Sequence, residues 1–385
     1  QTKPTIKGNT MLTKQDIIDK ALELGFDDIG FTNAEAFHEH KPFLQKIPDN
    51  YTWAVASGLQ LEEGCNPATV LPQAQCIVVI LQNYYKYDFP KSMEPFFGRC
   101  YMYDDRVTRD GLTIKIKQFI AFLRDAGIKT KTPFHLPQKA AAARAGIGTF
   151  GKNCLLYANN TARKSSWINP VTIVIDKEYE PGKPTVAAGC PDWCRNACIA
   201  ACPTRALKGN CTIDSQRCIS YLTYYASDIT PYELREPMGL SVYGCDRCQE
   251  VCPRNKAWMS QVLPINERVA KKAPYFDLIK LLHMDEKYFL HYIWAHMFYT
   301  PATDMWRWKM NVARAMGNSN DDRFIPELIA EFNNTNDQRV QGMIAWALGK
   351  IGGVRAGDAL HRFRAGATHS VLHEIERALD YLHHY

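Results

Sequence analysis

The first half of the chain alternates between helical and extended patterns of apolar residues. In residues 13–24 the apolar side chains recur at helical spacing, and Gly25 ends the pattern. Residues 26–31 have the pattern of a short strand, and the unbroken apolar run 76–81 is typical of a buried strand. Residues 112–125 return to helical spacing. This mixture predicts an α+β domain in which helices cover a sheet.

The last eighty or so residues carry helical patterns only. Two segments, 311–317 and 339–352, are partial copies of one another, which is the signature of a helical solenoid of the HEAT kind. Such solenoids present a concave binding face. Before them, residues 264–298 form an aromatic-rich connector with short helical pieces. The five predicted helices of the repeat region span residues 306–316, 323–332, 339–350, 356–363 and 371–382.

Composition places the chain among globular proteins of two or three domains. It has 385 residues, of which 46% are hydrophobic and 22% charged, and its apolar runs are far too short to cross a bilayer. Residues 1–10 are polar and lack the apolar core of a signal peptide, so we expect a flexible extension, a natural start at Met11 and a reducing cytoplasmic location. The expected parts are this extension, an α+β domain (11–180), a cysteine-rich domain (181–265), a helical connector (266–303) and a repeat domain (304–385).

The net charge of +6 is concentrated in one segment. Residues 111–165 contain ten Lys or Arg and a single acid, Asp125. Such a cluster can face a phosphate-bearing cofactor or a nucleic-acid backbone, or it can be a solvated helix face with loops. The repeat region, in contrast, has balanced charge, so its composition permits nucleic-acid binding without requiring it.

Two cysteine runs dominate the middle of the chain. The first ends in Cys202-Pro203 and the second in Cys252-Pro253, each after a gap of three residues. This ending is typical of bacterial two-cluster ferredoxins, in which the last cysteine of one run ligates the cluster of the other run. Iron–sulfur electron transfer is therefore the predicted chemistry.

Eight cysteines provide the thiolates that two 4Fe-4S clusters need. The first run has three-residue gaps throughout, wider than the usual gaps of two, which leaves open whether it holds a complete cluster. Exchanging the terminal cysteines gives one cluster bound by Cys190, Cys194, Cys198 and Cys252 and a second bound by Cys202, Cys218, Cys245 and Cys248, with Cys211 left over.

Zinc and disulfides are the alternative interpretations of these cysteines. Structural zinc sites use paired Cys-x2-Cys knuckles and have no need of a recurring Cys-Pro ending. Disulfide frameworks belong to small secreted domains, whereas this chain is long and shows no signal peptide. Both alternatives are weaker than the iron–sulfur interpretation.

A glycine-rich turn at residues 144–153 is the second informative stretch. An alanine-rich helix leads into Arg144, Gly146 and Gly148, and Lys152 follows. Glycines permit close approach of the backbone to a ligand, and the two basic side chains can meet its anionic groups. The alternative is that Gly146 simply caps the helix, and from the turn alone we favour this cap.

The order of these parts, together with several motifs, resembles the epoxyqueuosine reductase family, whose iron–sulfur and corrinoid core is related to that of the reductive dehalogenases. The resemblance implies a base-off cobalamin in the N-terminal domain, two 4Fe-4S clusters fed by a ferredoxin or flavodoxin, and a monomer that binds a tRNA anticodon arm on its repeats. It implies reduction of epoxyqueuosine to queuosine through Co(I). The motifs that carry the resemblance span residues 144–148, 202–207, 217–223, 243–253 and 345–352.

The resemblance also implies site residues. The position of the family's catalytic Asp is occupied here by Thr132, whose hydroxyl cannot act as a carboxylic acid near neutral pH. His135, with an unperturbed pKa of about 6.5, is the alternative proton donor nearby. The segment 99–110 departs from the family as well. The cobalamin contacts implied by the resemblance are Arg144, Gly146, Ile147, Gly148, Lys152 and Asn153.

Two other functions are compatible with the same features. Loss of the Asp suits a paralogous corrinoid reductase that acts on a small molecule, as the reductive dehalogenases do. A non-catalytic electron-transfer or tRNA-binding protein is the third hypothesis. The basic segment and the repeats favour tRNA, whereas Thr132 favours the paralogue.

Overall fold

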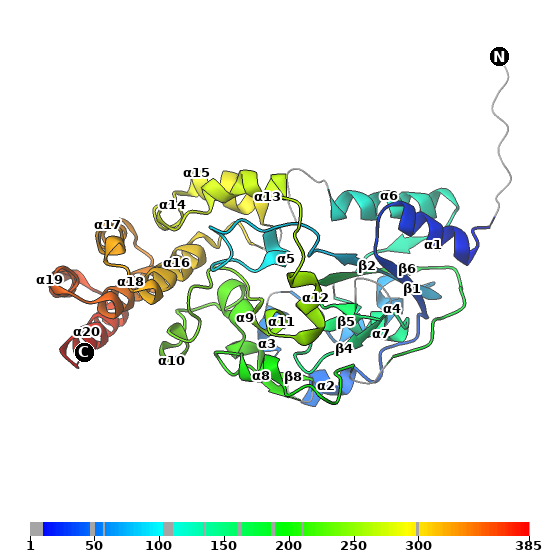
Figure 1. Cartoon of the computed structure of the whole chain (residues 1–385), viewed down its shortest axis with the longest axis horizontal. Helices are drawn as coiled ribbons and strands as arrows, with labels where there is room; N and C mark the ends of the chain where they lie inside the picture. Colours follow the sequence, from blue (N-terminus) through cyan, green and yellow to red (C-terminus); the bar gives the residue numbers. More distant parts are fainter. Residues whose placement is uncertain are drawn as a thin grey trace, which may run out of the picture.

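A four-stranded antiparallel sheet organises the N-terminal part of the protein in the computed structural model (Figure 1). The central strand β2 pairs along its whole length with β6 and also with β1. The structure describes residues 11–46, 51–56, 58–102, 111–133, 135–159, 164–185, 189–209, 211–297 and 300–384. In the order β1-β2-β6-β3 the strands span Asp28–Asn33, Cys76–Asn83, Ile168–Ile175 and Thr130–Lys131.

Both faces of the sheet are covered, which explains why the sequence of β2 is an unbroken apolar run. Its side chains alternate between two cores: Val78 and Ile80 face the helices α1 (Lys14–Glu23) and α6 (Leu112–Asp125), whereas Ile77 and Val79 face α7 (Gln138–Arg144). Figure 1 shows α1 and α6 on one side of the sheet and α7 on the other. The sheet therefore holds the N-terminal end of α7, which becomes part of the site, in a fixed position.

Shorter elements complete the N-terminal domain. The hairpin of β4 and β5 follows α7 directly and pairs Gly148 with Ala158. The other short elements are α2 (Lys41–Lys46), α3 (Thr52–Ala56), a 3-10 helix (Glu63–Cys65), α4 (Pro67–Val70), α5 (Arg99–Met102), β4 (Gly148–Phe150) and β5 (Leu156–Ala158).

The cysteine-rich domain contains two similar short helices that contact each other, α8 (Ala197–Ala200) and α11 (Arg247–Glu250). Each helix carries one cysteine and is followed by a Cys-Pro pair. The domain has almost no regular structure beyond short pieces, as expected where bound clusters organise a fold. These pieces are β7 (Leu207–Gly209), β8 (Thr212–Ile213), a 3-10 helix (Ser215–Arg217), α9 (Ile219–Tyr224), α10 (Tyr232–Arg235), a 3-10 helix (Pro253–Asn255) and α12 (Lys256–Met259).

The C-terminal part is a stack of helices, in which α18 packs between α16 and α20. Its core is continuous with that of the preceding connector. The repeat helices are α16 (Met305–Ser319), α17 (Ile325–Asn334), α18 (Gln338–Ile351), α19 (Val354–Phe363) and α20 (His369–His384). The connector holds α13 (Glu267–Lys272), a 3-10 helix (Ala273–Tyr275), α14 (Leu278–Leu282), α15 (Glu286–Tyr288), a π-helical turn (Phe289–Ile293) and a 3-10 turn (Trp294–His296).

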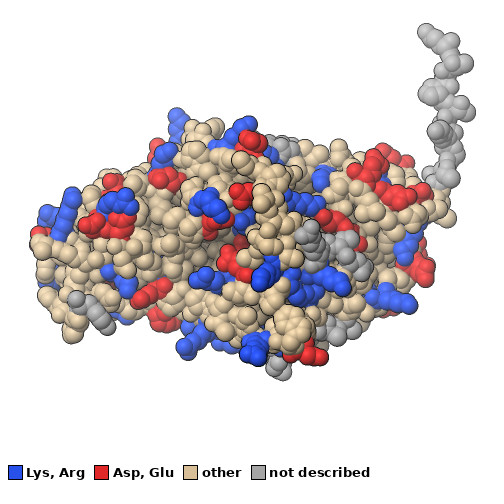
Figure 2. All heavy atoms as spheres, in the orientation of Figure 1, with Lys and Arg blue, Asp and Glu red and all other residues tan. Residues whose placement is uncertain are grey.

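The predicted elements are confirmed, including all five helices of the repeat region and the α+β class of the first domain. The expected flexible extension, residues 1–10, lies outside the described residues, as do Arg163 of the basic segment and most of the segment 99–110. Among the helices that the structure describes, none combines the length and the apolar character needed to cross a membrane. On the face shown in Figure 2, Lys and Arg are interspersed with Asp and Glu over the repeat helices, in agreement with their balanced composition.

A buried ion pair joins the cysteine-rich domain to the last helix. Arg235 of α10 donates to both carboxylate oxygens of Glu374 in α20, at 2.6 and 2.7 Å, and the two side chains are only 2% and 11% exposed. Glu374→Ala leaves this guanidinium buried without its partner, so we expect the free energy of unfolding in urea to fall by about 3–5 kcal/mol. As a control, Glu376→Ala removes a surface pair with Arg364 and should cost less than about 1 kcal/mol. Equal losses in both variants would contradict the prediction.

Candidate active site

A cavity of about 1680 Å³ lies between the sheet domain and the cysteine-rich domain. Its walls come from the end of β2, the start of β6, the first turns of α6 and α7, the β7–β8 hairpin, the end of α9 and residues 265–268 before and within α13. Sites for drug-sized ligands usually measure about 300–1,000 Å³, so this cavity suits a larger ligand.

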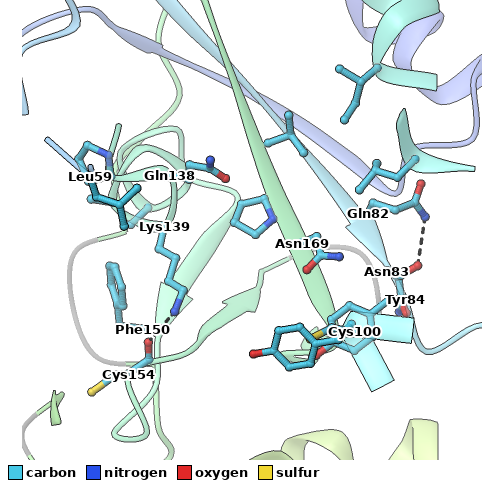
Figure 3. Close-up of a pocket in the computed structure, with 18 of the residues that line it drawn as sticks. Leu59, Gln82, Asn83, Tyr84, Cys100, Gln138, Lys139, Phe150, Cys154 and Asn169 are labelled. Atoms are coloured by element: carbon cyan, nitrogen blue, oxygen red, sulfur yellow. Dashed lines mark hydrogen bonds between the residues drawn. The ribbon is translucent and has the colours of Figure 1, made fainter. Parts of the chain in front are cut away.

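Three of the amide side chains that line the cavity lie at one edge of the sheet. Gln82 and Asn83 stand at the end of β2 and Asn169 at the start of β6, so neighbouring antiparallel strands bring them to one edge (Figure 3). Asn83 is 2% exposed; its Oδ1 accepts from the backbone N–H of Tyr85 at 2.6 Å, whereas its Nδ2 has no partner among the described residues. A buried amide donor without a partner costs free energy unless a ligand satisfies it.

These features fit the corrinoid that the family resemblance implies. A corrin ring is large and carries amide side chains on its rim, and the cavity offers mostly apolar walls together with Gln82, Asn83 and Asn169. The sequence alone missed these residues, although the position of two of them at the end of an apolar strand was a usable signal.

Phenols and thiols form much of the remaining wall. The Tyr101 hydroxyl donates to the Tyr224 hydroxyl at 3.3 Å, and burial raises the pKa of both phenols. Burial also raises the pKa of the Cys154 thiol to about 12 and that of the Cys100 thiol well above its ordinary value. These groups therefore stay protonated at neutral pH.

The basic segment does not form a single anion-facing surface. Half of its Lys and Arg side chains bond to groups within the described protein, since Lys115 donates to the Gly25 carbonyl, Arg124 to Thr130, Lys139 to the Cys154 carbonyl, Arg144 to Glu39 and Lys152 to Asn196. Three of these, Lys115, Lys139 and Arg144, line the cavity. The excess positive charge is thus partly directed inward.

Arg144 lines the cavity but already has a strong partner. Its guanidinium donates to both carboxylate oxygens of Glu39 at 2.8 and 2.6 Å and lies 3.9 Å from the centre of the Phe37 ring. Burial raises the pKa of Glu39, but the hydrogen bonds from Arg144 outweigh it and hold that pKa below its usual value. A direct bond from Arg144 to a cofactor stays a prediction, and it requires the guanidinium to share its donors.

The glycines of the turn approach the protein's own chain. Gly146 has φ +77°, and a Cβ there would lie 2.4 Å from the Lys183 carbonyl oxygen, which explains why the position needs glycine. Gly148 packs against Leu156, and Ile147 is buried in the core below α7. None of the three is among the described residues that line the cavity, and the interpretation of Gly146 as a helix cap agrees with the structure. The contact of these three residues with cobalamin stays a prediction.

Lys152 and Asn153 contact the cysteine runs instead of the cavity. The backbone N–H of Lys152 donates to Sγ of Cys190 at 3.3 Å, and Asn153 Nδ2 donates to the Cys248 carbonyl at 3.4 Å. Their predicted contact with cobalamin stays a prediction, and the bonds that the structure gives them lie beside the cysteine runs. Hydrogen bonds to cluster thiolates influence the reduction potential, so this turn has a functional position of a different kind.

Neither predicted proton donor reaches the cavity. Thr132 lies on the surface after β3, and His135 is half-buried with its carbonyl against Gly64. Neither is among the described residues of the lining, because the chain turns away between β3 and α7. The hypothesis that His135 replaces the family carboxylate therefore lacks geometric support.

The electrostatic neighbours of three cysteines are compatible with the crossed assignment, which stays a prediction. The pKa of the Cys198 thiol is raised by its burial and then by the charges of Cys252, Cys190 and Cys194. The pKa of Cys248 is raised by burial and then chiefly by Cys245 and Cys218, and that of Cys218 by burial and also by Cys202. The described residues contain no three Cys, His, Asp or Glu side chains arranged around a single ion. A four-iron cluster bonds each thiolate to a different iron, so its ligands need not converge on one point.

A buried hydrogen-bond network links the second run to the cavity. Gln249 of α11 lies between Cys248 and Cys252 in the chain. It donates from Nε2 to the Tyr84 hydroxyl at 3.0 Å and to Asp246 at 2.9 Å. On the other side, the Tyr157 hydroxyl donates to Sγ of Cys252 at 3.1 Å. The cavity and the clusters therefore share one rigid wall.

The crossed assignment predicts different outcomes for two cysteine variants. Cys252→Ser removes the fourth thiolate of the cluster built on Cys190, Cys194 and Cys198, so we expect anaerobically reconstituted protein to lose the iron of that cluster. Cys211→Ser should keep the wild-type iron content, because Cys211 lines the cavity and belongs to neither set. Iron per chain and the electron paramagnetic resonance of the reduced protein measure both results. Loss of iron in Cys211→Ser would overturn the assignment.

Comparisons with known proteins agree with this arrangement. A family model for a 4Fe-4S double cluster binding domain matches residues 190–255, and one for a PBS lyase HEAT-like repeat matches residues 340–363. Both confirm predictions made from the sequence.

Similarity to curated and solved proteins extends over nearly the whole chain. Epoxyqueuosine reductase of Bacillus cereus is 31% identical over 96% of this chain and 97% of its own, and that of Staphylococcus aureus is 29% identical over 97% and 98%. A structure from Bacillus subtilis, in which the catalytic aspartate loop is swung out of the active site, gives a TM-score of 0.82 at 28% identity over 96% of this chain and 98% of that one. An epoxyqueuosine reductase with an epoxyqueuosine-modified tRNA stem loop gives 0.81 at 27% identity over the same shares. This protein belongs to the epoxyqueuosine reductase family.

Proposed function

We propose that this protein reduces the epoxide of epoxyqueuosine in tRNA to the alkene of queuosine. The observation that carries the proposal is the position of the cavity, whose wall is shared by the sheet domain and the cysteine-rich domain. Lys139 of the cavity wall interacts electrostatically with Cys248 and Cys218, two of the predicted cluster ligands, so a substrate in this cavity would lie near that cluster. Family membership supplies the substrate class.

The chain's own residues divide the work. Two sets of four cysteines hold the clusters, which pass electrons singly, and a bound base-off cobalamin supplies the reductive chemistry that side chains lack. Gln82, Asn83 and Asn169 would hold it by hydrogen bonds to its amide groups, and the apolar walls would exclude water from the reacting atoms. We take the donor to be a ferredoxin or flavodoxin acting on a cytoplasmic monomer.

Aromatic side chains at the edge of the cavity favour a nucleic-acid substrate. Trp53 of α3 lies 4.5 Å from Tyr225 and 5.1 Å from Tyr221 between ring centres, and Trp53 and Tyr225 line the cavity. All three rings are partly exposed. Proteins bind unpaired bases by stacking them on such rings.

The aromatic group is continuous with the repeat helices. Arg339 of α18 lies 3.4 Å from the centre of the Trp306 ring of α16 and donates to the Ser227 carbonyl, which follows α9 in the chain. A stem loop placed on the first repeat helices can therefore reach the cavity with one extruded base. This arrangement agrees with the predicted tRNA contact on the repeats.

A small-molecule corrinoid reductase is the second candidate. The observation in its favour is Thr132, which replaces the family carboxylate and lies outside the cavity.

A turnover experiment distinguishes the two functions. Protein reconstituted with cobalamin and both clusters, and reduced anaerobically, should convert an epoxyqueuosine-containing anticodon stem-loop into its queuosine form, detected by mass spectrometry as loss of one oxygen. No product from fully loaded protein would contradict the tRNA function and direct the search to organohalides.

Removing the largest stacking ring should weaken substrate binding. Stacking of a base on an aromatic ring contributes about 1–3 kcal/mol, so Trp53→Ala should raise the Kd for the stem-loop by roughly 5- to 150-fold. Trp53→Phe keeps a stacking surface but loses the hydrogen bond from Nε1 to Ser215 Oγ, and it should bind nearly as well as the wild type. Fluorescence anisotropy with a labelled stem-loop measures both. Unchanged binding by Trp53→Ala would remove this ring from the proposed substrate site.

A further inference from the structure

The proposed reaction needs a proton donor that the motifs do not supply. Conversion of an epoxide to an alkene consumes two electrons and two protons and releases water. The first C–O bond breaks readily only if its oxygen is protonated as the bond breaks. This inference rests on the proposed function and concerns which side chain gives that proton.

Most acidic groups of the cavity are too weak. Burial raises the pKa of Tyr84, Tyr101 and Tyr224 and of the thiols Cys100 and Cys154, so these groups release a proton reluctantly. The carboxylates among the described lining residues are Glu39, which is ion-paired with Arg144 at 2.6 Å, and Glu267, which is exposed at the start of α13. Ionised carboxylates have no proton to donate.

The other basic side chains of the cavity either bond to groups of the protein or are unsuited to donate a proton. Lys86 forms an ion pair with Asp27 at 2.8 Å, and Lys115 donates to the Gly25 carbonyl at 3.1 Å on the α6 side. A guanidinium such as that of Arg144 or Arg268 does not release its proton in proteins. Burial lowers the pKa of His40 below 6.5, which leaves that imidazole neutral at pH 7.

Burial also raises the pKa of Tyr51, Tyr225 and Cys211 in the lining. Among the cationic side chains of the lining, Lys139 has the geometry that suits the task. It lies in the first turn of α7 among the residues that line the cavity, and Nζ donates to the Cys154 carbonyl at 3.2 Å (Figure 3). A neutral carbonyl holds the ammonium in place without neutralising it. Because an ammonium has three N–H groups, two remain for a ligand.

We propose that Lys139 is the catalytic proton donor of this cavity and gives a proton from Nζ to the epoxide oxygen. The first C–O bond breaks as this proton is transferred and the Lys139 ammonium becomes an amine. A low-potential one-electron donor supplies two electrons in succession. The second C–O bond then breaks with a proton from solvent, so the alkene forms, the oxygen leaves as water, and a further solvent proton restores the ammonium.

The electrostatic surroundings support an acid that works near neutral pH. Burial lowers the pKa of Lys139 below the ordinary 10.5 of lysine, and the cysteines near it, Cys154, Cys248, Cys218 and Cys100, oppose that shift only when they are ionised. The donor has to be protonated, so turnover should fall as pH rises through this pKa. The acidic side of the profile should be unaffected by Lys139.

Substitution of Lys139 tests the role. Lys139→Met should lower kcat for the stem-loop by roughly 10²- to 10⁴-fold, and Lys139→Arg, which keeps the charge but holds its proton, should lose about as much. Both variants should keep the wild-type iron content, cobalamin spectrum and stem-loop Kd and should lose the fall of rate at high pH. In Lys139→Ala, added methylammonium should restore part of the rate. Lys117→Met, on an exposed position of α6 outside the cavity, serves as the control and should behave as wild type.

A measurement that requires no turnover, the pH dependence of lysine acetylation, separates this inference from the proposed function. Trace acetylation of the full protein, followed by peptide mass spectrometry over a pH series, should modify Lys139 at lower pH than Lys117, and the stem-loop should protect Lys139 alone. If the wild type forms queuosine and Lys139→Arg is equally active, Lys139 is not the donor although the proposed function stands. If the wild type forms no product, the proposed function fails. If Lys139 is acetylated only at the high pH at which an ordinary lysine reacts, its role as an acid is overturned as well.

Discussion

The site depends on the contact between one turn of the sheet domain and the two cysteine runs. The N–H of Lys152 reaches the Cys190 thiol, Asn153 reaches the Cys248 carbonyl, and Tyr157 reaches the Cys252 thiol. These bonds come from a turn that the β4–β5 hairpin holds against the sheet. Together with the bond between Gln249 and Tyr84, they place the cysteine runs relative to the cavity. Since electron transfer depends steeply on distance, the rigidity of this turn is a functional requirement.

The repeat helices also have a fixed position relative to the cavity, which matters for the proposed substrate. A buried Arg235–Glu374 pair and a continuous apolar core attach them to the cysteine-rich domain and the connector. Their position relative to Trp53 and Tyr225 is therefore fixed, and a bound stem-loop would present its bases to the cavity at a defined depth. Binding energy gained on a remote surface can in this way position a reacting group.

The predicted replacement of the family carboxylate by Thr132 is compatible with the proposed role of Lys139. The segment of Thr132 lies away from the cavity here, whereas α7, a few residues later, directs Lys139 into it. A relative from Bacillus subtilis has been seen with its catalytic aspartate loop swung out of the active site, so the corresponding segment has more than one position in that protein. An ammonium on a helix offers a proton donor in a fixed position, in place of a donor on a loop. The titratable groups that line the cavity are consistent with this replacement.

The sequence by itself determined the parts of the protein. Apolar periodicity located β2, α1, α6 and the repeat helices, and the Cys-Pro endings identified the two cluster runs, because these signals are local and short in range. Only the tertiary structure decided what each basic or glycine residue does. Gly146, which the sequence allowed as either a cap or a ligand contact, packs against the Lys183 carbonyl, Lys152 faces a cluster thiol, and Lys139 enters the cavity. These roles depend on contacts with segments up to about a hundred residues away in the chain. A local sequence pattern does not predict which distant segment a residue will contact.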